Sequence, residues 1–313
     1  MTNNQASQPV TVAVLAGGTS AEREVSLRSG AAVQAALEAK GYAVLMLDPH
    51  DGLSQSLLEQ ADVAFPVLHG IGGEDGSIQS LLDELKIAYV GTGAKESALC
   101  FDKWQYKQLL REHNLPVPDG ALVNREEFAA SPLTERPFVL KPNDGGSSVD
   151  TIIARDGLSG VDEHLRDDIF ARHGRMLLEE LIPGTEITVA VLDGHTLPVI
   201  EIVPPESGEF DYDNKYNGKS QELCPPQTVD PVVQQKAQAL AAQIHTLVGC
   251  RDFSRTDMMI DSDQNLYVLE TNTIPGMTDQ SLFPKAAATA GIPMSELTDM
   301  LVRAALARRT AKS

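Results

Sequence analysis

Four polar side chains in the C-terminal third have the types and spacing to bind a cation beside a phosphate. Residues 255–261 and 266–272 each read as a short strand, and the polar turn 262–265 joins them. Because side chains alternate between the two faces of a strand, pairing these strands gathers four polar residues on one face: Arg255, Asp257, Glu270 and Asn272. Two carboxylates and an amide oxygen suit Mg²⁺, and a neighbouring arginine could stabilise charge that develops during a reaction.

One register of this hairpin separates the charged residues from the apolar ones. It places Asp257 opposite Glu270 and Arg255 opposite Asn272. It also predicts three further facing pairs: Met258–Leu269, Ile260–Tyr267 and Asp261–Leu266. The solvated outer face of an ordinary hairpin is the alternative interpretation, because acidic surface faces are common.

A second candidate lies in the middle of the chain, where an apolar strand ends in Lys141 and a small, glycine-rich loop follows at 143–148. Backbone N–H groups in such a loop can surround a phosphate, and the lysine adds a positive charge. The lysine precedes the glycines, so this is not a Walker A loop, and a flexible hairpin loop is the alternative. The strand 176–180 continues into 181–184, which could hydrogen-bond an adenine edge or serve as a domain hinge.

Composition limits the kind of protein that carries these residues. The chain has 313 residues, 42% hydrophobic residues and a net charge of −19, which argues against nucleic acid and anionic membranes as main partners. The three cysteines are widely spaced and odd in number, so we predict buried free thiols rather than disulfides or metal ligands. No signal peptide and no membrane-spanning segment is expected, and the cytoplasm is the predicted compartment.

The elements that must position these residues fall into three predicted units. Residues 1–95 alternate strands and helices, which predicts a doubly wound parallel sheet whose ligands lie beyond the carboxyl ends of the strands. Gly17-Gly18 and 69–76 fall at such ends, although a tight turn explains the glycines and a hydrogen-bonded turn explains His69 equally well. Two further units are predicted at 96–184 and 185–313.

Within the third unit, the sequence predicts a hairpin of 186–192 and 196–203, followed by a long polar loop and three helices. The loop, at 207–226, is the natural candidate for a lid because long loops in compact domains often cover a binding site. One helix is predicted at 231–248, and two more follow Gln280 and Pro293.

Six separated motifs occur in an order that resembles the ATP-grasp superfamily, and within it the D-alanine–D-alanine ligase family, over nearly the whole chain. They are residues 17–26, 68–76, 141–149, 211–216, 255–257 and 270–282. The Ala-Glu-Arg-Glu-Val-Ser and Pro-Gly-Met-Thr segments are specific to this ligase family. The resemblance implies an α/β fold with an α+β ATP-grasp part, in which an N-terminal doubly wound parallel-sheet domain precedes two ATP-grasp subdomains that clamp ATP.

The resemblance implies a set of ATP contacts in this chain: Lys103, Lys141, Ser147, Ser148, Glu179, Glu180, Leu181, Ile182, Glu186 and Lys215. Among these, Lys103 and Lys141 would hold phosphates, 179–182 the adenine and Glu186 the ribose. It also implies two Mg²⁺ ions, for which Mn²⁺ can substitute, on Asp257, Glu270 and Asn272.

The resemblance further implies two D-alanine sites and a D-alanyl phosphate intermediate in the synthesis of a peptidoglycan precursor. Glu22 would hold the ammonium of the first D-alanine, His69 would lie near that substrate, and Ser281 would hold the carboxylate of the second. Arg255 and the Gly276 N–H would stabilise the oxyanion. Tyr216, on the lid, would seal the site by hydrogen bonds with Ser147 and Glu22. The family also implies a homodimer.

Two other functions stay open, and five positions depart from the family pattern: Asp150, Thr256, Ile274, Asp279 and Gln280. The chain could make D-alanyl-D-lactate or D-alanyl-D-serine, although Lys215-Tyr216 favours an amine as second substrate, or it could be a non-catalytic nucleotide- or amino-acid-binding protein. Asp150 stands where the family has glycine. Its charge near the phosphate loop could alter the loop or weaken ATP affinity.

Overall fold

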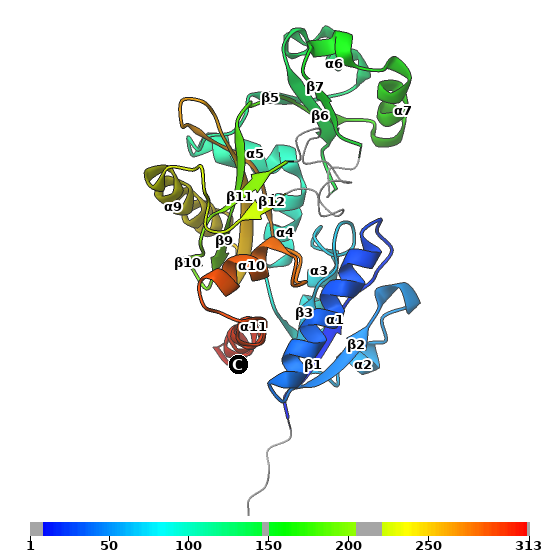
Figure 1. The fold of residues 1–313 in the computed structure, drawn as a ribbon. Helices are drawn as coiled ribbons and strands as arrows, with labels where there is room; N and C mark the ends of the chain where they lie inside the picture. Colours follow the sequence, from blue (N-terminus) through cyan, green and yellow to red (C-terminus); the bar gives the residue numbers. More distant parts are fainter. Residues whose placement is uncertain (1–8, 146–149, 205–220, 312–313) are drawn as a thin grey trace, which may run out of the picture.

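The computed structural model describes residues 9–145, 150–204 and 221–311, which form three β-sheets with their covering helices (Figure 1). The sheet of β5–β8 lies at one end of the molecule, the N-terminal sheet lies at the other, and the third sheet lies between them. Each sheet falls within one of the three predicted ranges, although the division into units stays a prediction.

The N-terminal sheet is parallel, as the alternating pattern predicts. Its strands are β1 (Thr11–Leu15), β2 (Ala43–Leu47), β3 (Val63–Pro66) and β4 (Ala88–Tyr89), in the order β2-β1-β3-β4. Its helices are α1 (Arg23–Ala39), α2 (Gln55–Leu58) and α3 (Ser77–Glu84), with a 3₁₀ turn at Pro49–Asp51. The apolar β1 is buried along nearly its whole length, because helices cover both faces of such a sheet.

The second sheet is antiparallel and carries the lysine strand. Its strands are β5 (Gly120–Val123), β8 (Met176–Glu180), β6 (Phe138–Pro142) and β7 (Ile152–Ala154), in that order. The helices α6 (Arg125–Ala130) and α7 (Glu163–His173) belong to the same region, with 3₁₀ turns at Pro132–Glu135 and Gly157–Gly160. Phe128 joins its core by ring contacts at 5.6 Å to Phe138 and 5.5 Å to Phe170.

The third sheet carries the predicted hairpin. Its strands are β12 (Gln221–Leu223), β11 (Ile200–Val203), β9 (Thr185–Leu192), β13 (Phe253–Ile260) and β14 (Leu266–Asn272), with β10 (His195–Thr196) beside β9. Its helices are α9 (Pro231–Val248) and α10 (Leu282–Thr289). The predicted strand 196–203 is wrong in its middle: it breaks at 197–199, where Pro198 has no N–H for the ladder. The predicted lid 207–226 is not all loop, because β12 pairs with β11 within it.

The hairpin register is correct beside the polar face and wrong beyond it. Arg255 pairs with Asn272 and Asp257 with Glu270, as predicted. An irregularity between Asp257 and Met258 then shifts the pairing by one residue. The observed pairs are Met258–Val268, Met259–Tyr267 and Ile260–Leu266, in place of those predicted. A β-bulge leaves Leu269 without a facing partner, so Leu269 and Glu270 both line the same cavity.

Two helices pack against sheets whose strands lie far from them in the sequence. Tyr106 and Leu110 of α5 (Lys103–Glu112), which follows α4 (Ala94–Phe101), join the core of the third sheet. The last helix, α11 (Met294–Ala311), packs against α1 and the N-terminal sheet instead. Its residues Leu297 and Leu301 share one core cluster with β1.

Two predictions from composition have clear outcomes among the described residues. The cysteines are free, as expected, but only Cys100 is buried, whereas Cys224 and Cys250 are partly exposed. No helix in the described ranges is long and apolar enough to cross a membrane.

Candidate active site

A cleft with two connected lobes lies where the three sheets meet. The first lobe, of about 730 Å³, is bounded by strands of the second and third sheets. The second lobe, of about 670 Å³, is bounded by α1, the loop after β3 and the segment after β14. The two lobes share several lining residues, among them Glu22, Lys103, Asp257 and Glu270. A ligand in one lobe can therefore touch a ligand in the other.

The polar hairpin face forms the wall between the lobes. Arg255 donates two hydrogen bonds to Asp257, from Nε at 2.9 Å and from Nη2 at 2.8 Å. Thr188 Oγ1 donates to the same carboxylate at 2.5 Å, and Asp257 is only 6% exposed. Asn272 Oδ1 accepts a hydrogen bond from the Ile274 N–H at 2.8 Å. This face is therefore an inner wall of the cleft, and the alternative of a solvated hairpin face is wrong.

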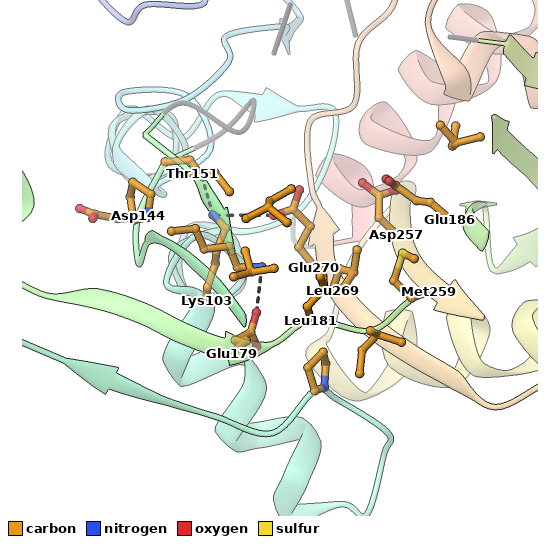
Figure 2. A pocket seen from close by; sticks show the side chains of 18 of the residues that line it. Lys103, Asp144, Thr151, Glu179, Leu181, Glu186, Asp257, Met259, Leu269 and Glu270 are labelled. Atoms are coloured by element: carbon orange, nitrogen blue, oxygen red, sulfur yellow. Dashed lines mark hydrogen bonds and ion pairs between the residues drawn. The ribbon is translucent and has the colours of Figure 1, made fainter. Parts of the chain in front are cut away.

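Lysines and apolar side chains line the first lobe (Figure 2). The side chain of Asp102 caps α5 by accepting from the Gln105 N–H at 2.9 Å, which sets Lys103 at the first turn of the helix. Lys103 Nζ donates to the Gly145 carbonyl at 2.5 Å and lies 3.7 Å from Glu270 Oε2. The apolar part of the lining consists mainly of Val139, Ile153, Leu181, Ile182, Met259 and Leu269. The lining of this lobe thus combines charged and apolar side chains.

The second lobe brings loops of the N-terminal sheet to the end of the hairpin. Ser20 Oγ donates to the His69 carbonyl at 2.7 Å and accepts from the Glu22 N–H at 3.2 Å, so the two loops are held together. His69 Nε2 lies 3.4 Å from Ser29 Oγ. Burial lowers the pKa of His69 to about 4, so the imidazole is neutral at pH 7.

Gly276 and Ser281 form a compact turn at the far side of this lobe. A Cβ atom at position 276 would lie 2.7 Å from Ser281 Oγ, so any other residue there would require the Ser281 side chain to shift. Ser281 Oγ accepts from the Thr278 N–H at 3.1 Å and lies 2.8 Å from Thr278 Oγ1. The turn therefore presents the backbone of Gly276 and the hydroxyl of Ser281 to the cavity.

The structure brings together every predicted site residue that it describes. Those lining the cleft are Glu22, His69, Lys103, Lys141, Glu179, Glu180, Leu181, Ile182, Glu186, Arg255, Asp257, Glu270, Asn272, Gly276 and Ser281. Four predicted residues lie outside the described ranges: Ser147, Ser148, Lys215 and Tyr216. The part of the chain that the structure describes holds no cluster of three or more His, Cys, Asp or Glu side chains placed to bind a metal.

Comparisons with known proteins place this cleft in a family. The family model described as D-ala D-ala ligase C-terminus matches residues 109–303, and the one described as D-ala D-ala ligase N-terminus matches residues 48–92. The chain belongs to the D-alanine–D-alanine ligase family. It is 43% identical to the D-alanine–D-alanine ligase of Xanthobacter autotrophicus over 95% of this chain and 99% of that protein. It is 42% identical to the ligase of Sphingopyxis alaskensis over 95% and 98%.

Solved structures of the ligase family have the same fold. A D-alanine–D-alanine ligase from Bacillus anthracis complexed with ATP matches with a TM-score of 0.82 and 31% identity, over 98% of this chain and all of that one. A second structure of a Bacillus anthracis D-alanine–D-alanine ligase matches with a TM-score of 0.81 and 31% identity, over 97% of this chain and all of that one. The expected α/β ATP-grasp fold is therefore confirmed.

Asp150, one of the departures from the ligase pattern, has its charge paired. Its backbone φ of +58° is in the left-handed region, where glycine is favoured and aspartate is tolerated better than most residues. Its Oδ2 atom lies 2.5 Å from Arg172 Nη1 and 2.6 Å from His173 Nε2. Burial opposes the charged form, but the hydrogen bonds from His173 and Arg172 outweigh it and hold the pKa of Asp150 below its usual value. The Arg172 guanidinium and the hydrogen bond with His173 thus offset the charge that we expected to weaken ATP affinity.

Sequence reasoning missed Glu74, which also lines the second lobe of this ligase cleft. Its Oε2 accepts from the Gly70 N–H at 2.7 Å. Burial, together with the neighbouring Glu22 carboxylate, raises the pKa of Glu74 to about 8. The signal was available, since Glu74 belongs to the family block at 73–76.

Glu74→Gln is expected to stabilise the protein more at pH 8 than at pH 5. Between the unfolded pKa near 4.5 and the folded pKa near 8, the folded state keeps a proton that the unfolded state has lost. Wild-type stability therefore falls as pH rises through this window, whereas glutamine does not titrate. Thermal unfolding at both pH values should show a gain over wild type that grows by roughly 1–3 kcal/mol. The exposed Glu84→Gln of α3 is the control, and a pH-independent gain for Glu74→Gln would contradict the assignment.

Proposed function

We propose that the cleft joins two D-alanine molecules into D-alanyl-D-alanine, with ATP converted to ADP and phosphate. The observation that carries this function is the nearly full-length match to D-alanine–D-alanine ligases at about 40% identity. The cleft supports it, because the polar hairpin face and the loops of the N-terminal sheet meet between its two lobes.

ATP fits the first lobe, whose lining offers both charged and apolar side chains. Lys103 and Lys141 would neutralise its phosphates, and the backbone of 179–182 would hydrogen-bond the adenine edge. Leu269 and Met259 offer apolar surface to the base, and Glu186 would accept from the ribose hydroxyls. The related ligase from Bacillus anthracis was solved with ATP bound. From the family resemblance alone, Ser147, Ser148 and Lys215 would also contact ATP.

Asp257, Glu270 and Asn272 are the proposed ligands of two Mg²⁺ ions, for which Mn²⁺ can substitute. Their oxygens are hard ligands from two neighbouring strands, and few protein ligands are needed when ATP phosphates complete the coordination. Bound Mg²⁺ would neutralise the phosphate charge that otherwise repels an attacking carboxylate. Arg255 and Thr188 hold the carboxylate of Asp257 in place.

The second lobe supplies residues for both D-alanines. Glu22 would pair with the ammonium of the first D-alanine, and the neutral His69 would lie beside it. The carboxylate of this substrate attacks the γ-phosphorus of ATP, ADP leaves, and D-alanyl phosphate forms. Ser281 would hold the carboxylate of the second D-alanine, whose amine then attacks the acyl carbon.

Arg255 and the Gly276 N–H would stabilise the oxyanion of this second step, and phosphate leaves as the peptide bond forms. Because water would hydrolyse the acyl phosphate, the lid proposed at 207–226 must exclude it, with Tyr216 sealing the site to Ser147 and Glu22.

Several wider properties are proposed on the same basis. The product would serve peptidoglycan synthesis in the cytoplasm, and the enzyme would act as a homodimer. The net charge of −19 supports the absence of nucleic-acid and membrane partners. The three units 1–95, 96–184 and 185–313 are proposed as domains, each containing one of the sheets.

The test of the function is phosphate release from ATP and Mg²⁺ with D-alanine, with the product identified by mass. One phosphate for each D-alanyl-D-alanine, and none with L-alanine, is the expected result. Preferential formation of a depsipeptide from D-alanine and D-lactate would identify a different ligase. ATP binding with no D-alanine-dependent turnover would contradict the enzymatic function.

A further inference from the structure

Lys107 is a completely buried lysine that the mechanism above does not use. It lies one turn after Lys103 on α5, and none of its side-chain surface is exposed. A buried ammonium is costly unless a partner compensates it. Its partner is Glu179 of β8, whose Oε1 accepts a short hydrogen bond from Lys107 Nζ.

Glu179 is shared between two lysines. Its other oxygen, Oε2, lies 2.9 Å from Lys141 Nζ, so each carboxylate oxygen holds one ammonium. Glu179 is itself 2% exposed, whereas 14% of the Lys141 side chain is exposed and that residue lines the first lobe. Glu179 lies at the base of this lobe in Figure 2. Lys107 is thus on the protein side of the carboxylate and Lys141 on the cavity side.

The charges of this trio do not cancel, since two ammonium groups face one carboxylate. Burial opposes the charge of Lys141, but Glu179 outweighs it and raises the pKa of that lysine. Burial lowers the pKa of Lys107 to about 8, against the attraction of Glu179. Near neutral pH, the trio therefore carries one excess positive charge, and Lys141 is the member that presents it to the cavity.

We propose that Lys107 is a positioning residue for ATP, which neutralises Glu179 from the protein side and so leaves the Lys141 ammonium available to the nucleotide phosphates. The inference rests on the proposed role of Lys141 in phosphate binding. Without Lys107, Lys141 is the one ammonium group left in the trio. The buried Glu179–Lys141 pair then carries no net charge. ATP must then compete with a buried carboxylate for the lysine.

Lys107→Met is expected to raise both the Kd of ATP, measured by calorimetry with MgCl₂ and no D-alanine, and the KM for ATP by at least about tenfold. The KM values for D-alanine should change less than twofold. Lys236→Met, at an exposed lysine of α9, is the matched control. Lys107→Arg keeps the positive charge beside Glu179, so its ATP affinity should stay within about threefold of wild type.

Two results would overturn the inference: an unchanged ATP affinity in Lys107→Met, or a loss in folded Lys107→Arg as large as the loss in Lys107→Met. If Lys107→Met does not fold, Lys107→Arg provides the test, because it keeps the charge and should keep ATP affinity within about threefold; a tenfold loss in a folded Lys107→Arg counts against the proposal. Failure of the proposed ligase function is distinct, since wild-type protein itself would then show no ATP- and D-alanine-dependent turnover.

Discussion

Glu270→Gln should lower the ligase turnover number by about a thousandfold or more, with little loss of stability. Glu270 lines both lobes and faces Asp257 across the hairpin, so it is the carboxylate best placed to hold Mg²⁺ against the phosphates. Glutamine keeps the shape but removes the charge that a hard cation requires. The ion pair with Lys103 is 3.7 Å long and the Glu270 side chain is 32% exposed, so its loss should cost less than about 1 kcal/mol of stability.

Steady-state kinetics across a Mg²⁺ titration, together with thermal unfolding, would measure both effects. The matched control is Asp263→Asn, which removes a carboxylate from the exposed turn of the same hairpin. We expect that control to keep the wild-type turnover number. Wild-type activity of Glu270→Gln at an unchanged Mg²⁺ requirement would remove the metal assignment.

Arg255→Met is expected to lower kcat by about 10²–10³-fold even at saturating Mg²⁺. Arg255 holds Asp257 through Nε and Nη2, and it also lines the second lobe, where we propose that the oxyanion forms. If the arginine only oriented Asp257, excess Mg²⁺ would restore the rate of the variant. If it also stabilises the oxyanion, the loss in kcat persists when Mg²⁺ and ATP both saturate.

The decisive measurement for Arg255→Met is kcat at increasing Mg²⁺ with saturating D-alanine. Arg125→Met, on the exposed side of α6, is the control for loss of an arginine, since its surface ion pair with Asp167 lies outside the cleft lining. Recovery of more than half of the wild-type kcat at high Mg²⁺ would limit Arg255 to a positioning role. The variant should also lose about 1–3 kcal/mol of stability, because the buried Asp257 loses two hydrogen bonds.

The sequence predicts the parts of this fold in which a local pattern decides the structure. Alternating strands and helices predicted the parallel N-terminal sheet, and the separation of charged from apolar residues predicted the hairpin register at Asp257 and Glu270. The bulge at Leu269 could not be predicted, because an extra residue in one strand leaves no distinctive residue type. The shift places the apolar side chain of Leu269 beside Glu270 in the lining of the first lobe.

Long-range packing explains the rest of what the sequence did not reveal. In the sequence, Lys107 fits the pattern of a polar residue on an amphipathic helix. Its burial against Glu179 results from the packing of β8 beside α5, which the local pattern does not reveal. The raised pKa of Glu74 depends on Glu22, which lies on a separate loop. In both cases the chemistry comes from charges that the fold brings together from distant segments.

The return of α11 to the N-terminal sheet has a consequence for how the chain is made. Leu297 and Leu301 belong to the same core as Val12 and Val14, although almost the entire sequence separates them. During synthesis the first strands leave the ribosome long before this helix exists, so the apolar surface that the helix covers stays exposed until residues 294–311 have been translated. We therefore expect nascent chains that stop before residue 294 to be caught by chaperones or proteases, whatever the state of the segments between.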